Sequence, residues 1–265
     1  MSDVLIIEPF TIGQDMSKPF FTVSAGTGAA NLVSDDPREL FICGAPGNAT
    51  LIDINLGVDT LFDTIYLGNT DAKAGDTWGL SYGTNAAGTV TTTQFFTDPI
   101  RLASEGLAAA RGPALFRFAV PIARRYIRLT LFRPAGVGAV PLQVGNLVVG
   151  NALRTTHGRE IGEVRTGFDA GVRTRLEDGG LTTVEAPFIE GFKWTFGDLS
   201  DAELKTLLGI RKRRKTTRPI LVIEDGEAVV TESLHYCTFI ELEAYNRLDP
   251  RKTRWALTVE DWLGS

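Results

Sequence analysis

The chain has 265 residues, of which 43% are hydrophobic and 22% charged, and its formal net charge is −5. This length suits one large all-β domain or two ordinary domains, and the 28 glycines and 12 prolines favour many short strands over a few long helices. Residues 1–150 hold 10 basic and 13 acidic residues, and residues 151–265 hold 17 and 19, so neither half has the basic charge of a nucleic-acid-binding domain.

The N-terminal segment lacks a targeting signal. Met1–Phe10 carries two acidic residues and no basic one, so it has no positively charged region of a signal peptide, and no run has transmembrane length. We therefore expect synthesis in a cytoplasm and no membrane insertion. Residues 1–35 are interpreted as an N-terminal arm with a first strand around Phe20–Val23.

Residues 36–151 have the pattern of a β-sandwich. In the segment 51–57, Ile52, Ile54 and Leu56 share one face. In the segment 77–83, Trp78, Leu80 and Tyr82 alternate with Gly79 and Ser81. This period of two is typical of half-buried strands. The predicted strands are Leu51–Gly57, Phe62–Gly68, Thr77–Gly83, Arg125–Leu131 and Leu142–Gly150. Glycine-rich and asparagine-rich turns separate them at a spacing that suits a sandwich or jelly roll.

Residues 152–265 form a second predicted domain, which is β-rich with one short helix. Ser200 and Glu203 have the spacing of a capping box, Leu204 and Leu207 fall with Leu208 on one helical face, and Gly209 supplies a stop. The predicted strands are Glu160–Thr166, Leu181–Pro187, Glu190–Phe196, Ile220–Glu224, Ala228–Thr231, Tyr236–Tyr245 and Arg254–Glu260. The predicted fold class is thus mostly β, a jelly-roll sandwich followed by this second domain.

Two resemblances extend this interpretation. The order of five segments resembles the discoidin, or factor V/VIII type C, domain, a galactose-binding-like jelly roll. These segments are Ala49–Gly57, Phe62–Asn69, Thr77–Tyr82, Ala123–Leu131 and Val144–Gly150. The resemblance covers residues 38–150 and implies recognition of glycan or lipid through loops at one end of the sandwich.

The C-terminal half is similar to tail-tip, or baseplate, proteins of tailed phages and gene transfer particles. The segments that carry this similarity are Asp198–Gly209, Arg218–Asp225, Tyr236–Glu243 and Trp255–Trp262. The similarity implies a structural, non-enzymatic part of a virion tail tip that is assembled in the host cytoplasm. It also implies a homo-oligomer with other tail or baseplate subunits and a host surface glycan as partners.

Chemistry-bearing residues are sparse. The chain has two histidines, and we interpret His157 as a solvated loop residue and His235 as a satisfied core or edge residue. Cys43 and Cys237 are far apart, which favours buried free thiols over a disulfide. The sequence contains no Walker A, HExxH or CxxC pattern, so no enzyme, cofactor or metal centre is expected.

One loop is the candidate ligand site. Asn69, Asp71 and Asp76 offer oxygen ligands for a sugar hydroxyl or a calcium ion, with ordinary loop polarity as the alternative. Trp78, just beyond them, is either a stacking platform for a sugar or a core residue.

The densest charge lies at 211–218. Arg211, Lys212, Arg213, Arg214 and Lys215 are candidate contacts with an acidic neighbouring subunit, and they also suit the negative end of the preceding helix. Nucleic acid is disfavoured, because no aromatic residues interleave the basic ones.

The favoured function is a structural tail-tip component that displays a carbohydrate-binding-like sandwich from an assembly domain. The alternatives are a free carbohydrate-binding module or adhesin, and a glycan-processing enzyme that carries the sandwich as an accessory.

Overall fold

The structure is a computed structural model, and it is mostly β, as the sequence predicts. It describes residues 4–12, 19–83, 92–96, 100, 111–160, 164–169, 171–175, 177, 180–186, 188–224, 233–240, 245–249 and 252–262. The chain divides into two compact units. The sandwich unit comprises Ile7–Ala152 and Val230–Leu234, and the second unit comprises Met1–Ile6, Leu153–Val229 and His235–Ser265.

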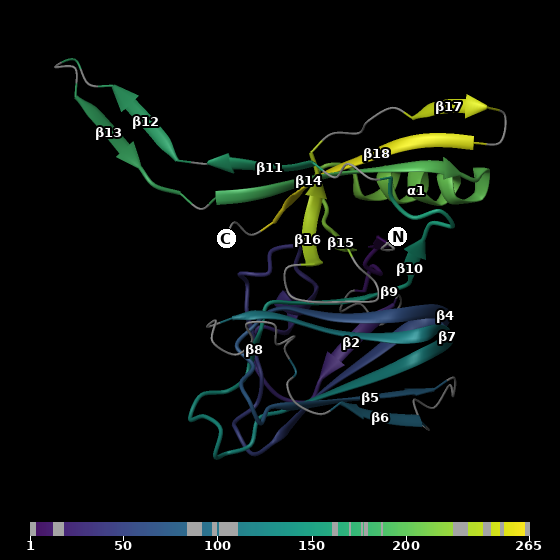
Figure 1. Cartoon of the computed structure of the whole chain (residues 1–265). Coiled ribbons are helices and arrows are strands. Elements are labelled where there is room, and N and C mark those ends of the chain that lie inside the picture. Colours follow the sequence, from purple (N-terminus) through teal and green to yellow (C-terminus); the bar gives the residue numbers. More distant parts are fainter. Residues whose placement is uncertain are drawn as a thin grey trace. The chain divides into compact units, whose positions relative to one another are not determined.

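The sandwich unit is built from antiparallel strands (Figure 1). They are β2 (Phe20–Val23), β3 (Phe41–Ile42), β4 (Ala49–Thr70), β5 (Thr77–Gly83), β6 (Thr92–Phe96), β7 (Gly112–Phe132), β8 (Gln143–Val144) and β9 (Asn146–Gly150), with a short 3-10 helix η1 (Ala29–Val33). One sheet has the order β2-β4-β7-β5-β6, with β9 also paired to β4, and β3 pairs with β8.

The strands β4 and β7 are the frame of this unit. Two predicted strands, Leu51–Gly57 and Phe62–Gly68, are parts of the single 22-residue strand β4. Its first half pairs with β2 and its second half with β9, and both halves pair with β7. The pairing with β7 shifts register between Asn55 and Thr60, where Gly57 has a φ of 82°. The two predicted strands are thus one strand with a break in its pairing.

One core joins both halves of β4. Ile52 and Leu67 are fully buried and belong to the same hydrophobic cluster. The register shifts of the β4–β7 pairing are bulges, which are the places where long strands bend. Trp78 belongs to that core and is 4% exposed.

The second unit contains the larger sheet. Its strands are β1 (Leu5–Ile7), β10 (Ala152–Arg154), β11 (Val164–Asp169), β14 (Phe188–Leu199), β15 (Ile220–Ile223), β16 (Leu234–Phe239), β17 (Asn246–Asp249) and β18 (Lys252–Asp261). The sheet order is β10-β1-β15-β16-β18-β14-β11, with β17 paired to β18. The sequence interpretation placed residues 4–7 in an arm, whereas in the structure all four are buried. The predicted strand Ala228–Thr231 lies outside the described residues.

The helix α1 (Asp201–Arg214) begins as predicted. Ser200 is its N-cap, and the capping box with Glu203 is present. The predicted stop at Gly209 is wrong, because the apolar spacing continues to Ile210 and the basic residues of the last turn face the negative end of the helix dipole. Leu207 and Ile210 pack into the core of the second unit. Among the described residues, no helix is long and apolar enough to cross a membrane.

Candidate functional site

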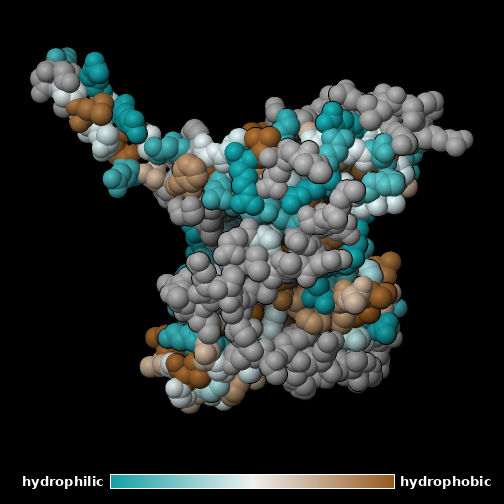
Figure 2. Space-filling view, viewed as in Figure 1, coloured by the Kyte–Doolittle hydropathy of each residue, from teal (hydrophilic) through white to brown (hydrophobic). Residues whose placement is uncertain are grey.

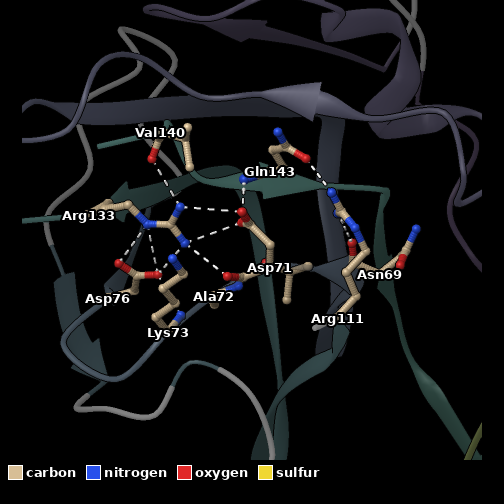
Figure 3. Close-up of polar contacts among 10 residues, drawn as sticks. Asn69, Asp71, Ala72, Lys73, Asp76, Arg111, Arg133, Val140 and Gln143 are labelled. Carbon is tan, nitrogen blue, oxygen red and sulfur yellow. Dashed lines mark hydrogen bonds and ion pairs between the residues drawn. The ribbon is translucent and has the colours of Figure 1, made fainter. Parts of the chain in front are cut away.

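The predicted ligand loop is organised by a buried arginine (Figure 3). Arg133 follows β7 and is 2% exposed, and the Asp76 side chain is completely buried. Arg133 Nε donates to Asp76 Oδ1 at 3.0 Å, and Arg133 Nη2 donates to Asp76 Oδ2 at 2.7 Å. Burial alone would lower the pKa of Arg133, but its hydrogen bonds to Asp76 and Asp71 raise it, so its guanidinium is a cation.

Asp71 and Asn69 also make contacts within the protein. Asp71 Oδ1 accepts a hydrogen bond from the Gln143 backbone N–H at 2.8 Å, and the Asp71 carbonyl accepts one from Arg133 at 2.9 Å. Asn69 Nδ2 donates to the Pro37 carbonyl at 2.8 Å, and Arg111 donates to the Asn69 carbonyl at 3.0 Å. These bonds tie the loop to the ends of the neighbouring strands.

The predicted ligand residues of this loop therefore already make contacts within the protein. Asp76 and Trp78 are buried, while Asp71 and Asn69 keep partial exposure. Within the described residues, no group of three or more His, Cys, Asp or Glu side chains is placed to hold a metal ion. The assignment of Asn69, Asp71, Asp76 and Trp78 to ligand binding stays a prediction.

Sequence reasoning missed Arg133 as the centre of this network. Ile127, Leu129 and Leu131 point inward, and Arg133 continues that alternation by two residues. A residue at an inward-facing position of this alternation is expected to be buried, and a buried arginine requires an acidic partner. The alternation was therefore a usable signal, although it does not identify Asp76 as the partner.

A second constellation lies where β4 and β7 lose register. Asn55 pairs with Tyr126 and Thr60 pairs with Arg124, so β4 carries a bulge of residues 56–59 opposite Arg125. Two arginines there lie over tyrosine rings. The Arg124 Cζ atom is 5.6 Å from the centroid of the Tyr82 ring, and the Arg125 Cζ atom is 5.0 Å from that of Tyr126. We call Arg125 and Tyr126 with residues 57–59 the bulge surface. Tyr82, with Arg124 over its ring, lies on the opposite face of the sheet, because it pairs with the buried Ile127.

The side chains of the bulge surface are held in place. Arg125 Nε donates to Asn55 Oδ1 at 2.9 Å, and Arg124 Nη1 donates to the Ala123 carbonyl at 2.7 Å. On the opposite face, the ring of Tyr82 meets that of Phe118 edge to face at 5.6 Å. Arg125 and Tyr126 are half-buried, so both side chains keep a solvent-facing part.

Large apolar side chains are exposed in the same stretch of the two strands. Val58 is 68% exposed, Leu61 is 53% and Val120 is 72%. Monomeric proteins usually leave such side chains scattered, whereas a group of them beside polar residues marks a contact surface. The bulge surface therefore combines apolar, aromatic and cationic groups.

The second unit contains a buried histidine between two carboxylates. His235 is 3% exposed, which confirms it as a core residue. Its Nε2 lies 3.4 Å from Glu224 Oε1, and its Nδ1 lies 3.4 Å from Asp261 Oδ1. Burial by itself lowers the pKa of His235, but the two carboxylates raise it to about 9. The resulting cation is stable because both ring nitrogens face an acid.

The same arrangement disfavours cysteine chemistry. Cys43 and Cys237 are buried free thiols, as predicted. Burial raises the pKa of Cys237 well above its ordinary value, so the thiolate needed for attack does not form. Since His235 uses both ring nitrogens on Glu224 and Asp261, it is not placed to activate this thiol. His157, the other histidine, is exposed in a turn, as expected.

The predicted basic contacts occupy the last turn of α1 and the residue after it. Lys212 and Arg213 are exposed, whereas Arg214 is buried at 6% exposure. Lys215 is the C-cap residue and has a φ of 54°. The role of Arg211, Lys212, Arg213, Arg214 and Lys215 in subunit contact stays a prediction, and burial makes Arg214 the least accessible of them.

A separate hairpin in the second unit has no packed face. The strands β12 (Val172–Arg175) and β13 (Leu181–Val184) pair only with each other among the described strands, and all eight residues are exposed. Val172 lies opposite Val184, and these two are 57% and 61% exposed. Figure 2 shows hydrophobic and hydrophilic side chains mixed along this hairpin.

No protein-family model and no curated protein matches the chain. About half of the chain is similar to solved carbohydrate-binding domains. Chitosan-binding module 1 of a chitosanase/glucanase from Paenibacillus sp. IK-5 is 15% identical, with a TM-score of 0.37, over 49% of this chain and 92% of that chain. The lectin domain of lectinolysin, solved with Lewis B antigen, is 15% identical over 50% and 92%, with a TM-score of 0.36. A third, CpGH89CBM32-6 from Clostridium perfringens, is 9% identical over 52% and 97%, with a TM-score of 0.37.

Proposed function

We propose that the protein is a non-catalytic recognition protein whose sandwich unit binds glycan at the bulge surface. The observation that carries this proposal is the half-buried Tyr126, which has Arg125 over its ring. A tyrosine ring offers an apolar face to the C–H groups of a sugar, and planar polar side chains bond to its hydroxyls. The exposed Val58 of the bulge adds apolar area.

Fixed side chains favour binding, because they lose little conformational entropy when a ligand arrives. The hydrogen bond from Arg125 to Asn55 supplies this fixation. The buried states of His235 and Cys237 support a role without catalysis.

A glycan array probed with the full chain tests the proposal. We expect saturable binding that is weakened at least tenfold by Tyr126→Ala and is unchanged by Lys73→Gln, because Lys73 is an exposed residue of the Asp71–Asp76 loop. Loss of binding in Asp71→Ala with no effect of Tyr126→Ala would instead place the ligand at the predicted loop. Absence of binding to any glycan would refute the proposal. Hydrolysis of a bound glycan by the purified chain would refute the non-catalytic part.

A second candidate function is a structural subunit of a phage-type tail tip that displays the sandwich in the virion. The observation that favours it is the β12–β13 hairpin. An isolated two-stranded hairpin is marginally stable in water, and exposed large apolar residues mark contact surfaces. Val172 and Val184 lie opposite each other in the register, so they share one face, and a neighbouring copy or tail subunit would cover it.

Light scattering of the full chain tests the assembly. We expect a mass of several copies, reduced by the double variant Val172→Ser and Val184→Ser but kept by Thr174→Ser. A monomeric mass for the unaltered chain would contradict self-assembly. A labelled antibody on purified particles tests the location, and label away from the tail end would exclude the tail tip.

A further inference from the structure

The outer face of the sandwich sheet carries two aromatic side chains in one row. Phe20 of β2 pairs with Asn55 of β4, and Asn55 pairs with Tyr126 of β7. Directly opposed residues of an antiparallel pair point to the same face, so these three side chains lie on one face of the sheet. It is the outer face, because Ile54, the neighbour of Asn55 along β4, is buried in the core. We call Phe20, Asn55 and Tyr126 the outer row.

The spacing of the two rings suits a chain of sugars. Neighbouring strands lie about 4.8 Å apart, so Phe20 and Tyr126, two strands apart, are roughly 10 Å from each other, about the length of two linked sugar rings. Both side chains are half-buried and keep a solvent-facing part. Gly83 of β5, which pairs with Tyr126 on its other side, has no side chain that would rise above the face. A chain that runs across the strands can therefore stack on both rings.

Polar groups between and beside the rings are placed to bond hydroxyl groups. Asn55 Oδ1 accepts hydrogen bonds from Arg125 Nε and from the Gly57 backbone N–H, both at 2.9 Å. These bonds fix the amide and leave Asn55 Nδ2 without a partner among the described residues. The next row holds Asp53 opposite Arg128. Their ion pair uses Arg128 Nε and Nη2, so Nη1 makes no hydrogen bond within the described part of the chain.

The charges of this face are nearly balanced. Asp53 and Arg128 form an ion pair although their side chains are 43% and 37% exposed. Arg125 is the cation beside Tyr126, and Asp59 of the adjoining bulge is exposed and carries the opposite charge. Such a balance matches an uncharged ligand better than a polyanion. A charged pair beside the centre of the face also disfavours a protein partner, because charged residues are depleted at the centres of protein interfaces.

We infer that the glycan bound by the sandwich unit is a neutral linear polysaccharide, which lies across β2, β4 and β7 on the outer row. This inference rests on the proposed glycan-binding function and names its ligand class. Tyr126 and the bulge surface bind one unit of the chain, and Phe20 stacks on a unit farther along. Asn55 and Arg128 bond hydroxyl groups between them. The affinity therefore depends on the length of the sugar chain.

Titration calorimetry of the full chain with mixed-linkage glucan, glucomannan and galactan, and with their di-, tetra- and hexasaccharides, tests the inference. We expect at least one polysaccharide to bind, with an affinity that rises about tenfold from its disaccharide to its tetrasaccharide and does not change as salt is raised.

Variants separate the two rings. Phe20→Ala should weaken binding of the hexasaccharide about tenfold and leave that of the disaccharide unchanged, whereas Tyr126→Ala should weaken both. Phe20→Tyr keeps an aromatic ring and should bind as the unaltered chain does. The matched control is Phe188→Ala, because Phe188 is 47% exposed in the second unit, and this variant should also bind normally. Hydrogen exchange of β2 and β4 in each variant confirms that a loss of binding is not a loss of fold.

Four results would overturn the inference. Equal affinity for the disaccharide and the hexasaccharide, lost in Tyr126→Ala, would confine the ligand to the bulge surface, while the proposed function would stand. Unchanged hexasaccharide binding in Phe20→Ala would reject the outer row in the same way. Preference for polygalacturonate over all three neutral polysaccharides would reject the ligand class alone. A lower mass of Phe20→Ala in light scattering, with unaltered glycan binding, would mark the row as a contact between copies. Absence of binding to any glycan, in contrast, would refute the proposed function itself.

Discussion

Replacing Asp76 by alanine should destabilise the sandwich unit by about 3 kcal/mol. Asp76 is completely buried and binds Arg133 through both carboxylate oxygens, and Arg133 is itself 2% exposed. Removing one partner of a buried ion pair leaves an uncompensated charge, which costs about 3–5 kcal/mol. Asp71 and the Val140 carbonyl still accept hydrogen bonds from Arg133, so the lower end of this range is expected.

Hydrogen exchange of the full chain measures this loss in the sandwich unit separately from the second unit. Peptides covering Thr77–Gly83 and the second half of β7 should exchange roughly 100-fold faster in Asp76→Ala, since 1.4 kcal/mol corresponds to a factor of ten. Peptides of β14 and β18 report on the second unit and should keep their rates. The matched control is Asp36→Ala, because Asp36 pairs with an Arg38 side chain that is 71% exposed, and such pairs contribute 0–1 kcal/mol.

A double variant isolates the pair. Asp76→Leu with Arg133→Met removes both charges, so it should cost less than Asp76→Ala alone. An increase in exchange of less than tenfold for Asp76→Ala would refute the reasoning, as would a double variant whose cost equals the sum of the two single ones.

Four further predictions concern the second unit and the thiols. Folding raises the pKa of His235 from 6.5 to about 9. The stability that the protonated ring gives the folded chain is therefore fully present below pH 6.5 and is lost as the pH rises through 9. Urea unfolding should show a fall of roughly 2–3 kcal/mol over this range, and His235→Gln should abolish it. Ser200→Ala should cost about 1 kcal/mol through loss of the N-cap, whereas Ser200→Asp should retain most of it; equal stability of both variants would contradict the cap. Hydrogen bonds from Ser200 and Thr156 outweigh the effect of burial and lower the pKa of Glu203 to about 2. The stability that Glu203 contributes should therefore be present above pH 4.5 and lost toward pH 2. In Glu203→Gln this dependence of stability on pH should be absent. Cys43 and Cys237 should stay unreactive to a thiol reagent at pH 8 until urea is added, because burial raises the pKa of Cys43 to about 12; rapid reaction of the folded chain would contradict their burial.

Local patterns in the sequence determined the strands and the start of the helix. The alternation of Ile52, Ile54 and Leu56 identifies a strand without knowledge of its neighbours, because successive side chains of a strand point to opposite faces. The capping box needs only Ser200 and Glu203, three residues apart. These signals act over a few residues, so they survive in any tertiary context that keeps the element.

The end of the helix shows where local signals stop being sufficient. Gly209 lowers the stability of a helix by about 1 kcal/mol relative to alanine, which made it a reasonable stop. Packing of Ile210 against the core of the second unit outweighs that cost, so the helix continues to Arg214. Only the tertiary structure supplies this contact.

The candidate sites depended on tertiary structure most of all. Asp76 and Arg133 are 57 residues apart, and nothing local to either one names the other. The register of β4 and β7 neutralises Arg128 with Asp53, and the break in that register leaves Arg124 and Arg125 without a carboxylate among the described residues. The sequence by itself identified several strands, such as Leu51–Gly57 and Arg125–Leu131, because strand periodicity is local. Which charges meet was decided by the pairing of distant strands, because that pairing sets the distances over which charges interact.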